Sequence, residues 1–349
     1  MALERGPQRI VGESSTLVEA LDQVSMVAPL DRPVLVLGER GSGKELIAER
    51  LHFLSSRWES SLHKLNCAAI SDQLLDSELF GHEPGSFTGA TRVHHGRFER
   101  ADGGTLFLDE LGAMSVRIQE KLLRLIEYGE FERVGGQKTI KVDIRIIAAT
   151  NADLKSMAKK GDFRADLLDR LAFDVVKVPP LRERLEDLPE LAEHFALRMS
   201  HELGWDYYSG FSQSAMQTLL DYTWPGNIRE LKNVVERSLY RWGDKDEPID
   251  EIVVDPFPEM PDLTAVHDSS AQSTGESTGV TAPLQNVLDS EGAGYDFAGK
   301  VKSFELELLR KALATCQYHQ KQTAEYLGLS YHQLRALLRK YKSELEVHS

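Results

Sequence analysis

A glycine-rich segment that follows an apolar run constrains this chain more than any other feature. Val34–Leu37 has the pattern of a buried strand, Gly38–Lys44 carries glycines at its first, fourth and sixth positions, and a helical pattern then runs to His52. Glycines here let backbone N–H groups approach phosphate oxygens, and a helix N-terminus favours an anion. The strand–loop–helix context predicts a phosphate-binding loop, with Lys44 supplying the charge, rather than a structural turn.

An acidic pair ends a second apolar run. Thr105–Leu108 has a strand pattern and is followed by Asp109 and Glu110. Asp109 can orient the water shell of Mg²⁺, and Glu110 can polarise the water that attacks a γ-phosphate. Glu45 stands where the general motif has a hydroxyl residue, so we expect phosphates, waters and Asp109 to hold the metal. The pair predicts hydrolysis of ATP with Mg²⁺, and the alternative is a solvated strand end.

Apolar runs alternate with helical patterns through the longer, first part of the chain. Ile144–Ala149 adds a third continuous apolar run, which is typical of a parallel sheet covered on both faces. After Pro180 the strand patterns stop, and three helical patterns follow up to residue 241. We therefore predict an α/β domain followed by a smaller all-α subdomain.

The charge of the chain is unevenly distributed. Its net charge is −14, yet residues 300–349 carry nine Lys and Arg against five Asp and Glu. Residues 256–299 contain no Lys or Arg and are rich in Ser, Thr and Gly, which predicts a flexible acidic linker. Because phosphates repel an acidic surface, any contact with DNA is expected at the C-terminal end. The expected parts are an α/β subdomain at 8–180, a helical lid at 181–255, the linker at 256–299 and a DNA-binding domain at 300–349.

The C-terminal part has the pattern of a helix-turn-helix. Leu327, Leu329 and Leu334 are spaced to form its core, with Gly328 at the turn, and the recognition helix is expected at 331–342. The alternative is a helical hairpin used for dimerisation, and Phe304, Leu308, Leu309 and Leu313 are candidates for a dimer seam. The residues expected to contact DNA are His332, Gln333, Arg335, Arg339 and Lys340.

Three glycines bracket an aromatic residue and a threonine between residues 81 and 90. The backbone can form a tight, mobile loop there that presents Phe87 to solvent, and an exposed aromatic side chain suggests a binding partner. The alternative is an ordinary hairpin insertion. The residues expected to contact the partner are Gly85, Ser86, Phe87, Thr88, Gly89 and Ala90.

These motifs together resemble the AAA+ enhancer-binding proteins that activate sigma-54-dependent transcription. The loop resembles the GAFTGA motif through which that family grips sigma-54, with Ser86 in place of the usual alanine. The resemblance implies an AAA+ parallel-sheet core with an all-α lid and a Fis-type helix-turn-helix. The nucleotide-binding residues expected on these grounds are Gly38, Glu39, Arg40, Gly41, Ser42, Gly43, Lys44, Glu45, Thr150, Asn151 and Arg229.

The resemblance also implies roles for single residues. Asn66 matches the family's asparagine that restrains the catalytic glutamate, here Glu110. Thr150 and Asn151 match sensor I, and Arg229 matches sensor II in the lid. Arg164 and Arg170 match the arginine fingers that reach a neighbouring subunit's site, although each could instead pair with a nearby carboxylate.

The implied partners are sigma-54 RNA polymerase, enhancer DNA and further copies of the chain, from a dimer to a hexameric ring. Because the ATPase pattern begins near Ile10, we expect no preceding receiver domain and control in trans. This resembles the phage shock branch of the family, which implies a membrane-stress response and phage shock protein A as negative regulator, with Trp58 as a candidate contact.

Other expectations follow from what the sequence lacks. It has no apolar run long enough to span a bilayer and no signal-peptide pattern, so we expect a cytoplasmic protein. Cys67 and Cys316 are far apart, without metal-ligand spacing. Two other classes stay open, a different AAA+ remodelling ATPase and an ATP-sensing DNA-binding repressor.

Overall fold

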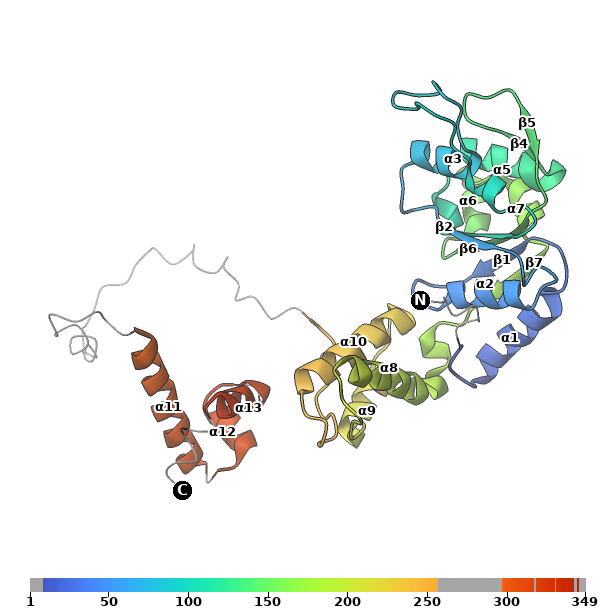
Figure 1. Cartoon of the computed structure of the whole chain (residues 1–349). Coiled ribbons are helices and arrows are strands. Elements are labelled where there is room, and N and C mark those ends of the chain that lie inside the picture. Colours follow the sequence, from blue (N-terminus) through green and yellow to red (C-terminus); the bar gives the residue numbers. More distant parts are fainter. Residues whose placement is uncertain (1–8, 257–296, 317, 330, 342–343, 345–349) are drawn as a thin grey trace, which may run out of the picture. The chain divides into compact units, whose positions relative to one another are not determined.

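The computed structural model describes residues 9–256, 297–316, 318–329, 331–341 and 344, and Figure 1 shows their elements. The chain divides into two compact units between Val254 and Asp255. The first unit holds a sheet, its covering helices and a helical lid, and the second holds three helices. Most of the predicted linker at 256–299 lies outside the described residues.

A five-stranded parallel sheet forms the centre of the first unit, with strand order β2-β3-β6-β1-β7. The register places Leu37 opposite Thr150 and Asn66 opposite Asp109. In a parallel sheet the carboxyl ends of the strands share one edge, so the segments that follow them gather there. The strands are β1 Val34–Leu37, β2 Leu62–Asn66, β3 Thr105–Asp109, β6 Arg145–Thr150 and β7 Asp174–Lys177.

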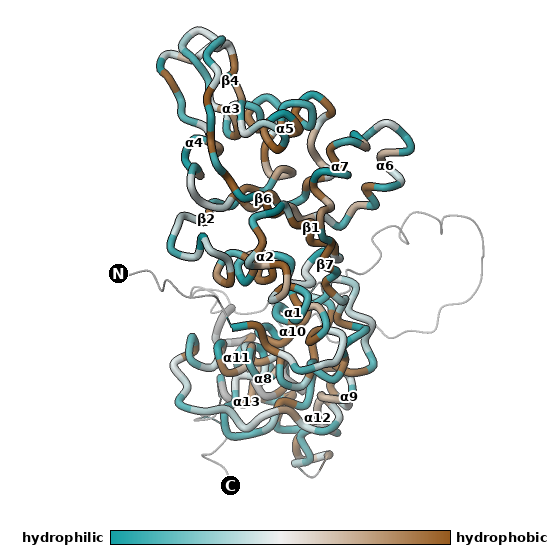
Figure 2. The backbone as a smooth tube through the Cα atoms, turned by 90° about the vertical axis from the view of Figure 1, so that its right-hand side faces the viewer, coloured by the Kyte–Doolittle hydropathy of each residue, from teal (hydrophilic) through white to brown (hydrophobic). Residues whose placement is uncertain are grey.

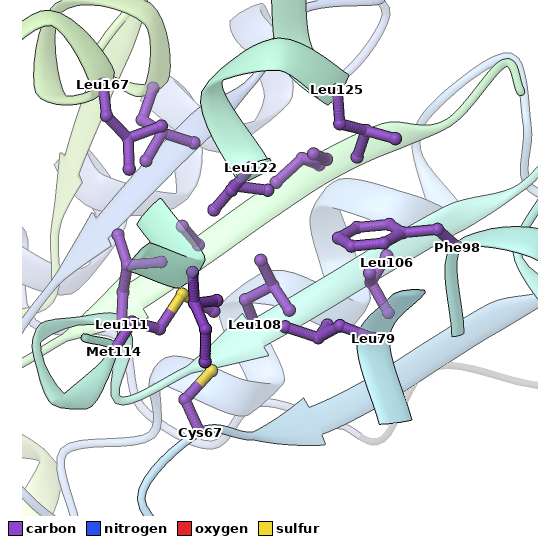
Figure 3. Close-up of a cluster of buried hydrophobic side chains, with 14 of the residues drawn as sticks. Cys67, Leu79, Phe98, Leu106, Leu108, Leu111, Met114, Leu122, Leu125 and Leu167 are labelled. Carbon is purple, nitrogen blue, oxygen red and sulfur yellow. The ribbon is translucent and has the colours of Figure 1, made fainter. Parts of the chain in front are cut away.

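Helices cover both faces of this sheet (Figure 1). Successive residues of a strand point to opposite faces, so Leu106 and Leu108 join one core and Phe107 joins the other. Figure 3 shows Leu106 and Leu108 among Leu79, Leu111 and Leu122 on the first face. The helices of this subdomain are α1 Ser15–Val27, α2 Lys44–Phe53, α3 Asp72–Phe80, α4 Arg97–Arg100, α5 Val116–Tyr128, α6 Leu154–Lys160 and α7 Ala165–Leu171, with a 3₁₀ turn at Leu111–Ala113.

Two insertions extend beyond the sheet. The first is the loop 81–96 between α3 and α4, and the second is the hairpin of β4 Glu130–Glu132 and β5 Thr139–Lys141. Val134 of the hairpin bonds to the backbone of Gly81 and Glu83 at the base of the loop, with N···O distances of 3.0 Å. The two insertions are therefore joined at their base. Figure 2 shows apolar stretches of the backbone at the strands β1 and β6.

A helical lid completes the first unit. It contains 3₁₀ turns at Leu181–Glu183 and Leu185–Asp187 and the helices α8 Leu188–Glu202, α9 Gln213–Asp221 and α10 Asn227–Trp242. Trp224 is fully buried between α9 and α10, and its indole N–H donates to the carbonyl of Leu219 at 2.8 Å. A buried indole needs such a partner.

The second unit consists of α11 Phe297–Thr315, α12 Gln320–Tyr326 and α13 Tyr331–Lys340. Its small core contains Leu309, Ala324 and Leu334. Leu309 and Leu313 are thus buried within one copy, so their assignment to a dimer seam was wrong, whereas Phe304 and Leu308 are exposed. Helix α11 begins at Phe297, three residues before the expected start of this domain.

The predicted fold class is confirmed, with a parallel-sheet core, an all-α lid and a three-helix C-terminal unit. No helix in the described ranges is both long and apolar enough to cross a membrane.

The packing of α5 gives a test of the core. Leu122 is fully buried and Arg124 is exposed on the same helix. We expect Leu122→Ala to lower the free energy of unfolding by about 2 to 5 kcal/mol, because it leaves a cavity. Arg124→Ala should change it by less than about 0.5 kcal/mol. Urea denaturation followed by circular dichroism measures both, and equal stabilities would contradict the assigned core.

Candidate functional site

The predicted phosphate loop connects β1 to α2, and its backbone conformation requires glycine. Gly41 and Gly43 have φ angles of +74° and +101°, which side chains disfavour. A Cβ on Gly41 would also lie 2.3 Å from the carbonyl oxygen of Gly226 in the lid. Helix α2 begins at Lys44, so its free N–H groups face the loop. The loop is built to surround an anion.

Lys44 is held inside this loop. Its side chain is buried, and Nζ donates to the carbonyl oxygens of Gly38 at 3.0 Å and Glu39 at 3.2 Å. Burial lowers the pKa of Lys44, whereas the charges of Glu110 and Asp109 act in the opposite direction. The ammonium group therefore lies in the field of the acidic pair.

The acidic pair lies at the end of β3. Asp109 Oδ1 accepts a hydrogen bond from the backbone N–H of Glu110 at 2.9 Å, and Oδ2 accepts one from Asn66 at 3.2 Å. Glu110 has a left-handed backbone with φ +52°, and its carboxylate lies 3.9 Å from Arg40. The Asn66 side chain thus donates its hydrogen bond to Asp109 and not to Glu110, the residue that it was expected to restrain. Glu110 instead pairs with Arg40.

Other predicted residues lie at the same edge of the sheet. Thr150 is buried at the end of β6, where its hydroxyl oxygen accepts from the N–H of Ala152 at 3.0 Å, and Asn151 is exposed beside it. Ser42 is buried and its hydroxyl donates to the carbonyl of Glu39. Glu45 instead pairs with Lys64 of β2 at 2.9 Å. The Glu45 carboxylate is thus engaged by a lysine of the neighbouring strand.

The lid adjoins the phosphate loop. The backbone N–H of Arg229 donates to the carbonyl of Gly41 at 3.3 Å, while the Arg229 side chain is exposed. A partly apolar pocket lies beside the loop between the segment before α1, α2 and the lid, and it suits the flat, mostly apolar face of a nucleobase. Sequence reasoning missed its residues, which include Ile10, Val11, Phe195, Ile228 and His194.

A buried carboxylate fixes one wall of this pocket. Asp187 accepts from the backbone N–H groups of Glu13 and Ser14 and from the Ser14 hydroxyl, each at 2.7 Å. A Cβ on Gly12 would collide with it at 2.5 Å. The acidic character of this segment had suggested only a favourable helix N-terminus. Asp187 instead holds the segment before α1, which lies about 170 positions away in the sequence.

The two candidate arginine fingers have partners within their own chain. Arg164 binds Asp166 through two hydrogen bonds of 3.1 and 2.7 Å, and Arg170 binds Glu127 at 3.0 Å. Both pairs are partly exposed. Such partly exposed pairs are weak.

The loop with Phe87 is closed by backbone bonds from Gly85 to Ala90 at 2.8 Å and from Ala90 to Phe87 at 3.0 Å. Thr88 is exposed. Phe87 is exposed, as expected, with 37% of its surface accessible, and its ring also packs edge-on against His82, with centroids 4.8 Å apart. The aromatic side chain is thus partly sheltered.

The C-terminal helix α13 carries the residues expected to contact DNA. Gln333 and Lys340 are exposed, and Lys340 forms an ion pair with Glu305 at 3.1 Å. His332, Arg335 and Arg339 belong to α13, but their side chains lie outside the described part of the structure.

Comparison with known families divides the chain in the same order as its fold. Residues 10–177 match the sigma-54 interaction domain, residues 182–251 match an AAA+ ATPase lid domain, and residues 300–341 match the Fis family of bacterial regulatory proteins. The chain is 55% identical over 333 residues to the Psp operon transcriptional activator of Escherichia coli K12, covering 95% of this chain and 98% of that protein. The chain belongs to the sigma-54-dependent transcriptional activators. It is an AAA+ ATPase and an enhancer-binding activator of transcription.

Two further proteins are also similar to this chain. The Nif-specific regulatory protein of Azotobacter vinelandii is 51% identical over 229 residues, which cover 66% of this chain and 44% of that protein. The crystal structure of NtrX from Brucella abortus in complex with ATP has a TM-score of 0.65 at 32% identity, covering 96% of this chain and 69% of the other.

The phosphate loop yields a direct prediction. Lys44→Ala should weaken ATP binding by roughly 10- to 100-fold, since a hydrogen bond to a charged group contributes about 1.5 to 3 kcal/mol. Fluorescence titration with a labelled ATP analogue measures it. Lys141→Ala on β5, which pairs with Glu130 within the hairpin, is the control and should bind normally. Unchanged affinity in the Lys44 variant would exclude this loop as the nucleotide site.

Proposed function

We propose that the chain couples ATP hydrolysis to remodelling of the sigma-54 RNA polymerase closed complex, with loop 85–90 as the part that grips sigma-54. The observation that carries this proposal is the hydrogen bond between Asn66 and Asp109. Asn66 ends β2, and the chain continues from β2 through α3 directly into the loop. A change in nucleotide at Asp109 therefore has a short mechanical route to Phe87.

In the proposed chemistry, the loop 38–44 holds the phosphates and Glu110 polarises the attacking water. Asp109 would orient Mg²⁺, which supplies charge neutralisation when bound. Thr150 and Asn151 sense the γ-phosphate from β6, and Arg229 reaches it from the lid. These assignments are supported by the gathering of the phosphate loop, the ends of β3 and β6, and the lid at one edge of the sheet.

We further propose that the protein works as a ring of copies, from dimers to a hexamer. Arg164 and Arg170 would then reach the γ-phosphate of a neighbour, where charge develops during hydrolysis. Their partly exposed pairs with Asp166 and Glu127 are weak enough to exchange for a phosphate. Hydrolysis would thereby depend on assembly.

Mixing two inactive variants tests this arrangement. Glu110→Gln removes the base but keeps the fingers, and Arg170→Ala removes a finger but keeps the base. Each should lose ATPase activity alone, whereas an equal mixture should recover it at about a quarter of its interfaces if copies associate at random in a ring. Release of phosphate measures the recovery. A mixture as inactive as its components would show that Arg170 does not act on a neighbour.

The loop is tested separately from the ATPase. Thr88→Ala should keep ATPase activity within about twofold and lose promoter opening. Thr88 is exposed, and it is far in sequence from the phosphate loop 38–44. Ser86→Ala is the matched control, since it restores the residue usual in the family, and it should retain activation. Transcription from a sigma-54 promoter with and without ATP reads out both. Full activation by the Thr88 variant would reject the assignment of the loop.

The same transcription assay separates the two competing functions. An ATP-sensing repressor would give no ATP-dependent transcripts, and a different remodelling ATPase would not bind sigma-54. Binding of sigma-54 in the presence of a transition-state analogue of ATP would favour the proposed function over both.

We propose that α11–α13 bind enhancer DNA, with α13 in the major groove and the exposed Phe304 and Leu308 pairing two copies. Because the chain divides after Val254, a chain ending at Pro256 should retain ATPase activity and lose specific DNA binding. Gel-shift titration at fixed salt measures the loss, and unaltered DNA affinity would place the DNA-binding surface elsewhere.

The chain is similar to the Psp operon transcriptional activator of Escherichia coli. From its resemblance to the phage shock branch of the family, we propose that the protein acts in the cytoplasm on a phage shock operon and is inhibited by phage shock protein A. Trp58 is 55% exposed and next to Arg57, whose guanidinium group is fixed by Asp31 and Asp143. An exposed indole on an anchored turn is a suitable contact for that regulator.

A further inference from the structure

Asn227 occupies an unusual position between the lid and the phosphate loop. It is the first residue of α10, it is fully buried, and its backbone is left-handed with φ +54°. Asparagine tolerates this conformation better than most residues with a side chain. Backbone geometry alone would suit glycine equally well, so the side chain needs a separate explanation.

The Asn227 side chain forms three hydrogen bonds to segments other than α10. Its Oδ1 accepts from the backbone N–H of Leu181, where the lid begins, at 2.8 Å. Its Nδ2 donates to the carbonyl oxygen of Arg40 and to the carboxylate of Glu39, both at 3.0 Å. One amide therefore ties the start of α10 to the phosphate loop and to the entry of the lid.

Glu39 extends this connection to the surface. Arg182 holds its carboxylate in a two-pronged pair, with N···O distances of 2.8 and 2.6 Å. The hydrogen bonds from Arg182 and then Asn227 lower the pKa of Glu39 to about 2, so its charge persists as pH falls until it nears that value. Nearly half of the Arg182 side chain and of the Glu39 side chain is exposed to solvent. The ion pair between them is therefore weak and reversible.

The backbone contacts complete the junction. Arg229 lies two residues after Asn227, and its N–H donates to Gly41 at 3.3 Å. Gly226 lies just before Asn227, and its carbonyl oxygen is the atom that a Cβ on Gly41 would strike. Three consecutive residues of the phosphate loop thus meet the first turn of α10, so a displacement of that loop by a phosphate moves Arg229 with it.

We infer that Asn227 is a positioning residue for ATP recognition, which acts through Arg229 by fixing the first turn of α10 on the phosphate loop, with the Glu39–Arg182 pair as its releasable outer half. The inference rests on the proposed role of Arg229 at the γ-phosphate. Neither the sequence motifs nor the chemistry of the acidic pair assigns a positioning role to Asn227, Glu39 or Arg182.

The test compares ATP with ADP, because only ATP presents a γ-phosphate to Arg229. Asn227→Gly keeps the backbone conformation and removes the amide. In the full chain we expect it to weaken binding of a slowly hydrolysed ATP analogue on the order of tenfold, the scale of a small misplacement, and ADP binding by less than about twofold. Equal losses for both nucleotides, or no loss in a folded variant, would overturn the inference.

A second comparison separates positioning from a general loss of lid stability. Val234→Ala leaves a cavity in the same lid core and should lower the melting temperature without changing the ratio of ATP to ADP affinity. Arg229→Ala should abolish the preference for ATP, and adding Asn227→Gly to it should cause no further selective loss. A further loss in the double variant would show that Asn227 acts independently of Arg229.

Glu39→Ala provides a variant whose change lies at the surface. It should reduce the ATP preference by about two- to fivefold, in keeping with an exposed charged pair, and this loss should also vanish in the Arg229→Ala background. An unchanged preference would exclude Glu39 and Arg182 from the mechanism. If the wild-type chain binds both nucleotides and hydrolyses ATP but these variants behave normally, only this inference fails. Absence of ATP hydrolysis in the wild type would instead refute the proposed function.

Discussion

The parallel register of β1, β3 and β6 underlies the rest of this structure. Backbone hydrogen bonds set Leu37 opposite Thr150 and carry Asp109 to the same edge of the sheet. Three segments that are distant in sequence therefore reach one point without any long side chain having to bridge them. Both faces of the sheet are covered by apolar helices, so a slip in register would displace core and site together. The packing of the core therefore fixes the positions of the site residues.

The lid is attached to this edge through different interactions. Its interior is apolar around Trp224, but its junctions with the core use polar groups such as Asp187 and Asn227. Buried apolar surfaces resist separation in proportion to their area, whereas a few directional hydrogen bonds can exchange partners with little change in buried surface. This division suits a lid that stays folded as a body while its contact with the phosphate loop changes.

Much of this architecture could be predicted from the sequence because its strongest signals are local. Continuous apolar runs located β1, β3 and β6, and the glycines of 38–44 located the phosphate loop. The resemblance to enhancer-binding proteins, now confirmed at the level of the family, identified the predicted helical subdomain as an AAA+ lid and the C-terminal helices as a Fis-type module. Helix ends were less certain, as the start of α11 at Phe297 shows, because the residues before residue 300 lack a strong helical pattern.

Contacts between distant residues could not be predicted in the same way. Nothing near Asp187 in sequence indicates that it holds Ser14, and the resemblance assigned Asn66 to a glutamate although the structure places it on Asp109. The sequence left two interpretations open for Arg164 and Arg170, which are contact with a neighbouring subunit's site and pairing with a nearby carboxylate. The structure of a single copy shows only the second. These contacts depend on which side chains meet after the chain has folded or assembled. The periodicity of the sequence does not indicate which side chains these are.

The packing of Phe87 on His82 affects how the loop engages a partner. A fully solvated phenyl ring would adhere to many apolar surfaces and would favour unwanted self-association. Because the ring already has an aromatic neighbour, binding exchanges one such contact for another, and a contact of this kind contributes only about 0.5 to 1.5 kcal/mol. In the proposed cycle, the free-energy difference between the docked and engaged states of the Phe87 ring would then be small, which would let the same ring bind and release its partner repeatedly.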